Sequence, residues 1–356
     1  MTQPFNSKAL TLARESRGLT QKELSELVRI PQSNLSKYEN GYYNTIDEES
    51  LKKLSDGLRY PPNFFKQQLE IFQPNLYYRK RVTVSSKLLS VAEATMNIYR
   101  ANIQKLLQGG ELQNSTLPTL DDQRGNPQEV AAFLRQFWKI PRGAIDNLTK
   151  RLEDNGIIVV ETDFLTDKID GRSMTTERGN YILFYNKHLS GDRQRFTLAH
   201  ELGHIMMHLS LPPVADVDVE KEANLFASEF LMPEREIKPH LVGRKLSIAV
   251  LADMKRVWKT SMQAILKWAE IIGAISTNHA RYLWSQISTM GIKKKEPIEI
   301  PVERPTLLKE IIDAFIKQLS YSREEIANML CLNLEDFMDK YFSQHSIFRI
   351  ERNYHA

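Results

Sequence analysis

The stretch RFTLAHELGH, residues 195–204, decides the fold of the central part of the chain. It reads as helix, and histidines four residues apart on a helix, here His200 and His204, point the same way. A divalent zinc ion can bridge that pair, and Glu201 between them is then placed to take a proton from a metal-bound water. Apolar residues surround the motif on every side, as in a helix buried in a domain interior. A metal would satisfy three buried polar groups at once, which hydrogen bonds to backbone carbonyls alone would not.

A zinc site needs a third protein ligand, and His208 is the nearest candidate. The extended three-histidine signature, however, has its last histidine two residues further on, where this chain has serine. His208 is therefore not expected to bind the metal.

Residues 220–231 read as a second amphipathic helix with one buried arc. The residues of this arc are Ala223, Phe226, Ala227, Phe230 and Leu231. At about 100° per residue, Glu220 falls at the edge of the arc and Asn224 lies one turn below it. Glu222 points to nearly the opposite side, which we interpret as a solvated face. We predict Glu220 as the third ligand and Asn224 as an outer partner that orients a histidine.

These two helices resemble the ImmA/IrrE family of metallopeptidases over about residues 125–290. The shared segments are RFTLAHELGH (195–204), ExxANxFA (220–227) and LMP (231–233). The resemblance implies one divalent metal, Zn²⁺ with Mn²⁺ as an alternative, held by His200, His204 and Glu220, with Glu201 as the general base. It also implies an unusual substrate class: DNA-binding repressors whose cleavage switches on stress-response or mobile-element genes.

The N-terminal region carries an independent signal. Thr20 and Glu23 form a capping box, Pro31 can open a second short helix over residues 32–40, and Gly41 ends that helix. Two short helices joined by a tight turn form a helix-turn-helix.

This region, about residues 6–66, resembles the lambda-repressor and Cro-like DNA-binding domain. The segments that carry the resemblance are GLTQKEL (18–24) and IPQSNLSKYENG (30–41). One departure is Arg29, where that family commonly has a glycine in the turn, so a positive φ at this residue is an open question. A role in binding protein rather than DNA is the alternative for such a domain.

In a helix-turn-helix the second helix enters the major groove, so polar residues near its start reach base edges. Gln32, Ser33 and Lys37 are these residues, and Gln21 at the start of the first helix is suited to a backbone phosphate. The predicted partner is a double-stranded DNA operator, and a homodimer would match a palindromic one.

Composition limits the remaining possibilities. The 356 residues suggest two or three domains, and 42% hydrophobic residues are ample for their cores. No run approaches the ~18 apolar residues of a membrane span, and the polar start lacks a signal-peptide core, so no membrane partner is expected. A single cysteine, Cys331, excludes intramolecular disulfides and fits a cytoplasmic location. Residues 1–81 hold 13 basic against 9 acidic residues, which accounts for the whole net charge of +4 and is compatible with DNA.

We expect a multidomain, mainly α-helical chain with a small sheet in an α+β, zincin-like peptidase domain. The expected divisions are a helix-turn-helix domain (1–70), a helical linker (71–124), the metallopeptidase domain (125–290) and a C-terminal helical module (300–345). Residues 157–160 and 181–185 are the strand candidates. Residues 87–108 read as a long helix, either a spacer or a dimer contact. Residues 251–275 read as a packed scaffold or a second DNA-binding surface, and the segment from 293–295 onward as a solvated linker.

The sequence thus predicts a transcription regulator joined to a zinc-dependent endopeptidase that cleaves a helix-turn-helix repressor. The alternative is a non-catalytic DNA-binding repressor whose metal site is structural or sensory. Both bind metal, so metal binding does not separate them, whereas an open coordination position and cleavage activity do. The residue that stabilises the oxyanion stays open among His188, Tyr181, Tyr185 and His240.

Overall fold

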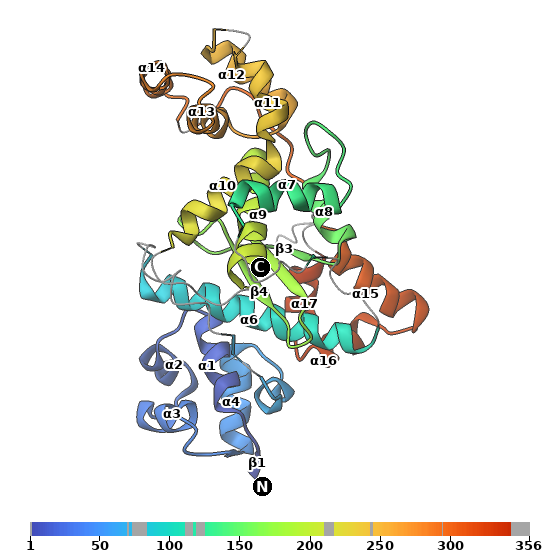
Figure 1. Cartoon of the computed structure of the whole chain (residues 1–356). Helices are drawn as coiled ribbons and strands as arrows, with labels where there is room; N and C mark the ends of the chain where they lie inside the picture. The colour runs from blue at the N-terminus through green and yellow to red at the C-terminus, as the bar shows by residue number, and fades with distance from the viewer. Residues whose placement is uncertain are drawn as a thin grey trace, which may run out of the picture.

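The computed structural model describes residues 2–69, 71–72, 84–110, 117–118, 125–209, 217–242, 245–293 and 295–342. Within these ranges the chain is mainly helical, with a small three-stranded sheet near its centre, as the sequence predicts. The N-terminal helices lie at one end of the molecule, and the helices from α11 (Glu234–Val242) to α14 (Thr277–Thr289) lie at the other (Figure 1). No helix of the described residues is long and apolar enough to cross a membrane.

The N-terminal elements form the predicted helix-turn-helix within a small helical unit. They are β1 (Thr2–Pro4), α1 (Ser7–Ser16), α2 (Gln21–Val28), α3 (Gln32–Glu39), β2 (Thr45–Asp47), α4 (Glu48–Leu58) and the 3₁₀ turn η1 (Pro62–Lys66). The capping box of Thr20 and Glu23 starts α2, and Arg29 ends it with φ 55°, a left-handed conformation held here without glycine. The buried face of α2 consists of Leu24 and Val28, whereas Leu27 is 54% exposed.

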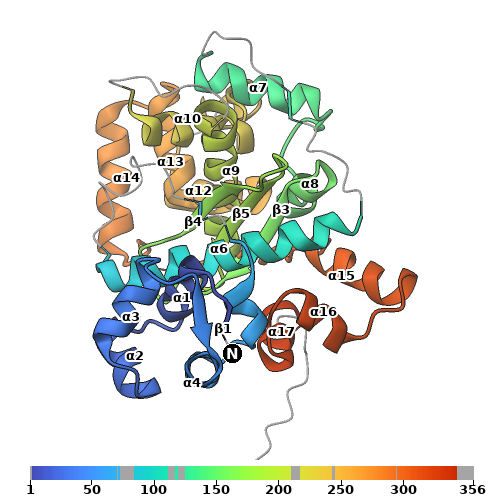
Figure 2. The same cartoon turned by 90° about the horizontal axis from the view of Figure 1, so that it is seen from below.

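The long helix α6 (Ser86–Gln108) lies between the N-terminal unit and the sheet (Figure 2). Its side chains are buried on several sides, and its N-terminal part packs against α1. Arg100 on α6 donates a hydrogen bond to the carbonyl of Thr175 at the end of a sheet strand. The helix is therefore part of the core of one chain rather than a free spacer.

The sheet consists of β3 (Ile158–Thr162), β4 (Gly171–Thr175) and β5 (Tyr181–Asn186) in the order β3-β5-β4. β3 and β5 are parallel, β4 and β5 antiparallel. Alternate residues of β3 and β5 face two different cores, since side chains along a strand point to opposite faces. Val160 and Phe184 belong to the core shared with α6, and Val159 and Leu183 to the core shared with the peptidase helices. The sequence predicted β3 and β5 but not β4.

The helices on the other face of the sheet, away from α6, include the one that carries the metal motif. They are α7 (Pro127–Phe137), α8 (Leu148–Asp154), α9 (Gly191–His204), the π-helical turn η2 (Ile205–Leu209), α10 (Val219–Leu231), α11 (Glu234–Val242), α12 (Ile248–Trp258), α13 (Met262–Ile271) and α14 (Thr277–Thr289). The turn between α12 and α13 holds Lys259 at φ 56°, as Arg29 is held between α2 and α3. Half of the residues of α13 are buried, including Trp268, which favours the scaffold interpretation over a second DNA-binding surface.

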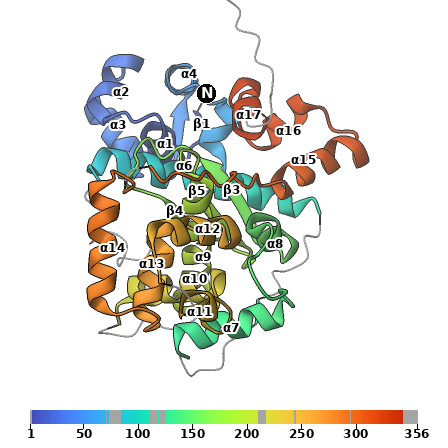
Figure 3. The same cartoon turned by 90° about the horizontal axis from the view of Figure 1, so that it is seen from above.

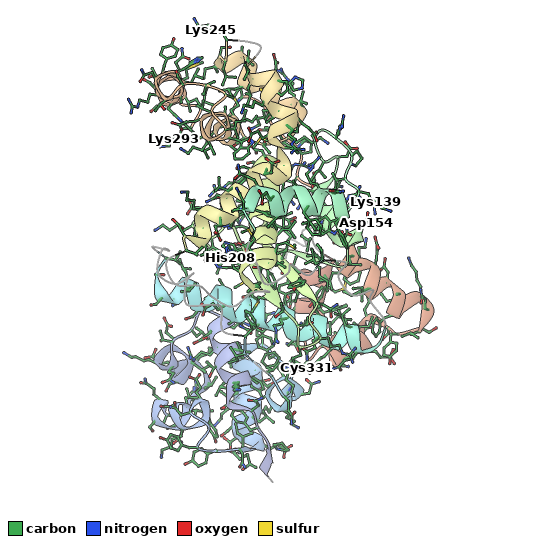
Figure 4. All side chains as sticks on the ribbon, viewed as in Figure 1. Lys139, Asp154, His208, Lys245, Lys293 and Cys331 are labelled. Carbon is green, nitrogen blue, oxygen red and sulfur yellow. The ribbon has the colours of Figure 1, made fainter. Side chains whose placement is uncertain are left out.

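The C-terminal helices return to the N-terminal unit. These helices are α15 (Leu307–Gln318), α16 (Arg323–Met329) and α17 (Leu334–Tyr341). Arg17, directly after α1, pairs with Asp336 of α17 at 2.5 Å, and the side chain of Asn333 donates to the carbonyl of Arg59. Cys331 is buried at this junction, as a free thiol (Figure 4).

The segment between α14 and α15 crosses the molecule to reach these helices (Figure 3). Our expectation of a solvated linker is wrong for its glutamates. Glu296 pairs with the buried Lys255 at 2.8 Å, and Glu303 pairs with Arg195, whose side chain is fully buried. The sequence did not reveal these two buried ion pairs, because a stretch rich in lysine is expected to be solvent-exposed unless its buried partners are known.

Candidate metal centre

The metal motif lies where α9 and α10 cross at close range. Gly203 on α9 faces Phe226 on α10, and a β-carbon added at Gly203 would stand 3.0 Å from that ring. Ala223 and Ala227 of α10 are fully buried. The small residues on both helices thus allow α9 and α10 to pack closely. This close packing brings together the polar side chains near the end of α9 and the start of α10.

The structure brings His200, His204 and Glu220 into one cluster. The Nε2 atoms of the two histidines are 3.0 Å apart. Carboxylate oxygens of Glu220 lie 3.4 Å from Nε2 of His200 and 3.5 Å from Nε2 of His204. One potential ligand atom from each residue lies within 4.8 Å of the other two, and the described residues contain no other such group.

Glu201 lies beside this cluster in an apolar setting. It is only 3% exposed, and its Oε2 atom is buried with no hydrogen-bond partner among the described residues. A buried carboxylate oxygen without a partner is costly, so this position fits a group or water that the cluster would bring. Two imidazoles and a carboxylate form a donor set that suits Zn²⁺ and is also compatible with Mn²⁺.

Each histidine of the cluster has a further partner at Nδ1. His200 Nδ1 lies 3.1 Å from the side-chain oxygen of Asn224, the contact that the helix geometry predicted. His204 Nδ1 lies 3.0 Å from Nδ1 of His208, whose Nε2 in turn lies 2.9 Å from a carboxylate oxygen of Glu222. Our expectation that Glu222 faces solvent is therefore wrong. It followed from treating α10 alone, without the π-helical turn η2 that faces it.

Electrostatics in the cluster favour an ionised carboxylate. Hydrogen bonds from His200 and His204 hold the pKa of Glu220 well below its usual range. Burial lowers the pKa of His200, but the hydrogen bond to Glu220 and the charge of Glu201 outweigh it, so the pKa lies above its ordinary value. A metal ion and the proton on His200 would compete for the same lone pair.

A groove of about 1690 Å³ opens beside the cluster. Glu220 and Asn224 form part of its wall, together with the start of α9, the outer face of α13 and residues of the segment before α15. Its apolar lining residues include Leu189, Phe196, Leu225, Ala264, Ile271, Ile298, Ile300 and Val302. Such a groove has room for an extended or helical peptide rather than only a small molecule.

The four candidates for the oxyanion-stabilising residue differ in their surroundings. The hydroxyl of Tyr185 is buried and donates to Glu161 at 2.6 Å, so it is already engaged. Of the four, only His188 lines the groove, where its Nε2 lies 3.3 Å from Asp163. Tyr181 and His240 do not line it.

The candidate DNA surface is α3. Gln32, Ser33 and Lys37 are exposed on it, whereas Leu35 is fully buried and anchors the helix to its neighbours. Gln21 is half-buried, and its side-chain amide donates to Glu39 at 2.7 Å. The amide nitrogen of Gln21, at the start of α2, thus has an intramolecular partner on α3.

Sequence reasoning missed three features around the metal motif. Gly171 of β4 abuts Glu201, His208 contacts Glu222, and Arg195 pairs with Glu303. Of these residues, only Gly171 could have been noticed in the sequence, as an isolated glycine at the start of a short, partly polar strand. The other pairs join residues far apart on different elements, and no spacing rule reports them.

Two protein-family models match this chain, one in the N-terminal region and one in the region that contains the cluster. The peptidase family M78 model, described as the IrrE N-terminal-like domain, matches residues 152–268, a range that contains the whole cluster. A helix-turn-helix model matches residues 10–65, which implies DNA binding. Comparison with curated proteins gives no match. The chain therefore combines an N-terminal helix-turn-helix DNA-binding domain with an IrrE N-terminal-like domain of peptidase family M78.

Proposed function

We propose that this protein is a DNA-binding transcription regulator with a zinc-dependent endopeptidase centre that cleaves a repressor-type protein. The observation that carries the proposal is the position of Glu201. Its buried, unpartnered carboxylate oxygen lies beside three residues whose ligand atoms are within 4.8 Å of one another. A purely structural four-ligand site would not require an unpaired carboxylate next to it.

His200, His204 and Glu220 would hold the ion, and Asn224 would keep His200 oriented. When bound, the metal supplies a Lewis acid that polarises a peptide carbonyl and acidifies a water. Glu201 accepts the proton of that water and can pass it on to the leaving amine. Glu201 is 3% exposed, so its burial keeps bulk water away from this proton transfer.

The edge strand β4 offers a place for an extended substrate. The hydrogen bonds from Asn186 N–H to Asp170 and from Thr176 N–H to Asn180 fix which residues pair with β5. By alternation, the backbone groups of Gly171 and Ser173 face away from β5, toward the free edge. A peptide added along this edge would lie beside Gly171, where a β-carbon would stand 3.3 Å from Cγ of Glu201.

The helix-turn-helix domain supports the choice of substrate. An operator bound through Gln32, Ser33 and Lys37 would bring the peptidase to promoters, where helix-turn-helix repressors are located. The substrate is then a separate repressor of this type or a second copy of this chain.

The test uses the variant Glu201→Gln, which keeps the size of the side chain but removes the base. Zinc content, folding and operator binding should stay near wild type, while cleavage of co-purified or operator-bound protein falls by about 10²- to 10⁴-fold. Alanine at His200, His204 or Glu220 should instead remove the zinc, measured by elemental analysis after dialysis, and Lys221→Ala serves as the control on the exposed side of α10. If the zinc-loaded wild type cleaves nothing, and wild type and Glu201→Gln regulate the same promoter equally, the metal site is structural or sensory.

A further inference from the structure

A chain of two hydrogen bonds leads from His204 away from the ligand cluster. His208, which is labelled in Figure 4, lies on the π-helical turn η2. It connects His204 to Glu222 on α10. The side chains of His204 and His208 are 1% and 10% exposed, so the contact between them is shielded from water, whereas Glu222 at the far end is 26% exposed. A hydrogen bond in such a setting is electrostatically stronger than one at the surface.

The positions of the protons in these two hydrogen bonds follow from Glu222, the last acceptor. The carboxylate of Glu222 only accepts, so Nε2 of His208 carries a proton and donates it to that carboxylate. Nδ1 of a neutral His208 is then a bare acceptor, and Nδ1 of His204 donates to it. With a metal bound, this leaves the lone pair of His204 Nε2 for the ion, in place of the proton that this nitrogen otherwise shares with Glu220. This is the tautomer that a metal ligand needs.

The two ligand histidines are therefore held in the same manner by different partners. His200 has Asn224, one helical turn after Glu220 on the same helix. His204 is held through two successive contacts, first with His208 and then with Glu222, so its orientation depends on both η2 and α10. π-helical turns are uncommon and frequently occur at functional sites.

We propose that His208 and Glu222 are positioning residues that fix the tautomer and ring orientation of His204 for metal binding. This inference rests on the proposed metal site but not on peptidase activity. Outer partners of ligand histidines commonly contribute 10- to 100-fold to metal affinity. Loss of either residue would free the His204 ring to rotate or to carry its proton on Nε2.

The experiment measures the zinc affinity of the full-length protein by competition with a chromophoric chelator. His208→Phe keeps a planar ring but removes both hydrogen bonds, and Glu222→Ala removes the terminal acceptor. Each should weaken zinc binding by about 10- to 100-fold. Glu222→Gln retains an oxygen that can accept from His208 and should recover part of the loss. The visible absorption bands of the Co²⁺-substituted protein should shift in the two damaging variants, since they report ligand orientation.

Matched controls are His279→Phe, a histidine bonded to the carbonyl of Leu246, and Glu234→Ala, which removes an exposed pair with Lys238. Both should bind zinc as wild type does. If His208→Phe does not fold, Glu222→Ala and Glu222→Gln still decide the matter. Zinc affinities within about twofold of wild type in these variants, with an unchanged Co²⁺ spectrum, would overturn the positioning role while leaving the peptidase proposal intact. A wild type that takes up no zinc would overturn both.

Discussion

Gly171 of β4 lies directly against Glu201 of α9. A β-carbon at Gly171 would stand 3.3 Å from Cγ of Glu201 and 2.5 Å from Cγ2 of Thr197. It would also stand 2.9 Å from the carbonyl oxygen of Phe184 on the neighbouring strand, which cannot easily move. The absence of a side chain at Gly171 therefore sets how closely the strand approaches the helix that carries the proposed base.

We expect Gly171→Ala to displace Glu201 without touching the metal ligands. The overpacking should lower the free energy of unfolding by about 1–3 kcal/mol. Peptidase activity should fall more than zinc content, because the substitution moves Glu201 and leaves the proposed metal ligands in place. Gly110→Ala, which meets no atom within 4 Å, is the control. Thermal melts, zinc analysis and timed digestion would measure the three effects, and an equal loss of zinc and activity would contradict the separation.

The recognition helix gives a prediction about DNA. Gln32→Ala and Lys37→Ala should each weaken binding to the specific operator by about 1–3 kcal/mol and affect non-specific DNA less if they contact bases. Lys52→Ala on α4 changes the same charge outside the recognition helix and should leave the specificity ratio unchanged. Fluorescence anisotropy with operator and scrambled duplexes, at one fixed salt concentration, gives the ratio. Retention of specificity in both variants would mean that α3 does not read the bases.

Much of the candidate site follows from local periodicity alone. The spacing of His200 and His204, and the angle between Glu220 and Glu222 on α10, place the correct carboxylate at the cluster. The same angular argument fails for the surroundings of Glu222. Periodicity says which side of a helix a residue occupies, but not which element covers that side.

The fold shows the same limit at a larger scale. Buried strands β3 and β5 are apolar runs that the sequence reveals, whereas β4 is short and partly polar, and its pairing depends on β5. The C-terminal helices were predicted as helices, but their contacts with Arg17 and Arg59 were not. Ion pairs across roughly 300 residues of sequence have no local signature.

Glu153 makes stability depend on pH. It is 8% exposed, and burial raises the pKa of its carboxyl to about 7, although N–H groups of Thr306 and Leu307 donate to it. The folded state therefore binds this proton more tightly than the unfolded state, whose pKa is near 4.5. The contribution to stability is complete below pH 4.5, falls as the pH rises to 7, and is constant above that.

The variant Glu153→Gln isolates this effect. The difference between the unfolding free energies of wild type and variant should change by up to about 3 kcal/mol between pH 4.5 and 7. Urea unfolding across this pH range would measure it. Parallel pH profiles for the two proteins would show that Glu153 titrates at its ordinary pKa, with its charge stabilised by the start of α15.

Two arginines on α9 provide a matched pair for the last prediction. Arg195 is fully buried and pairs with Glu303, and Arg193, two residues earlier, pairs with Asp170 in a largely exposed position. Removal of one partner of a buried pair leaves an uncompensated charge, so Glu303→Ala should cost about 3–5 kcal/mol of unfolding free energy. Asp170→Ala should cost about 1 kcal/mol or less, because water solvates the Arg193 that remains.

The zinc affinity of the Glu303→Ala protein makes this comparison informative about the site. Arg195 lies little more than one helical turn before His200, so a shift of α9 at Arg195 would be transmitted to the ligands along the helix. We expect weaker zinc binding in Glu303→Ala and unchanged binding in Asp170→Ala. Equal unfolding free energies for the two variants would mean that Arg195 finds another partner when Glu303 is lost, and that the segment before α15 does not anchor the metal-bearing helix.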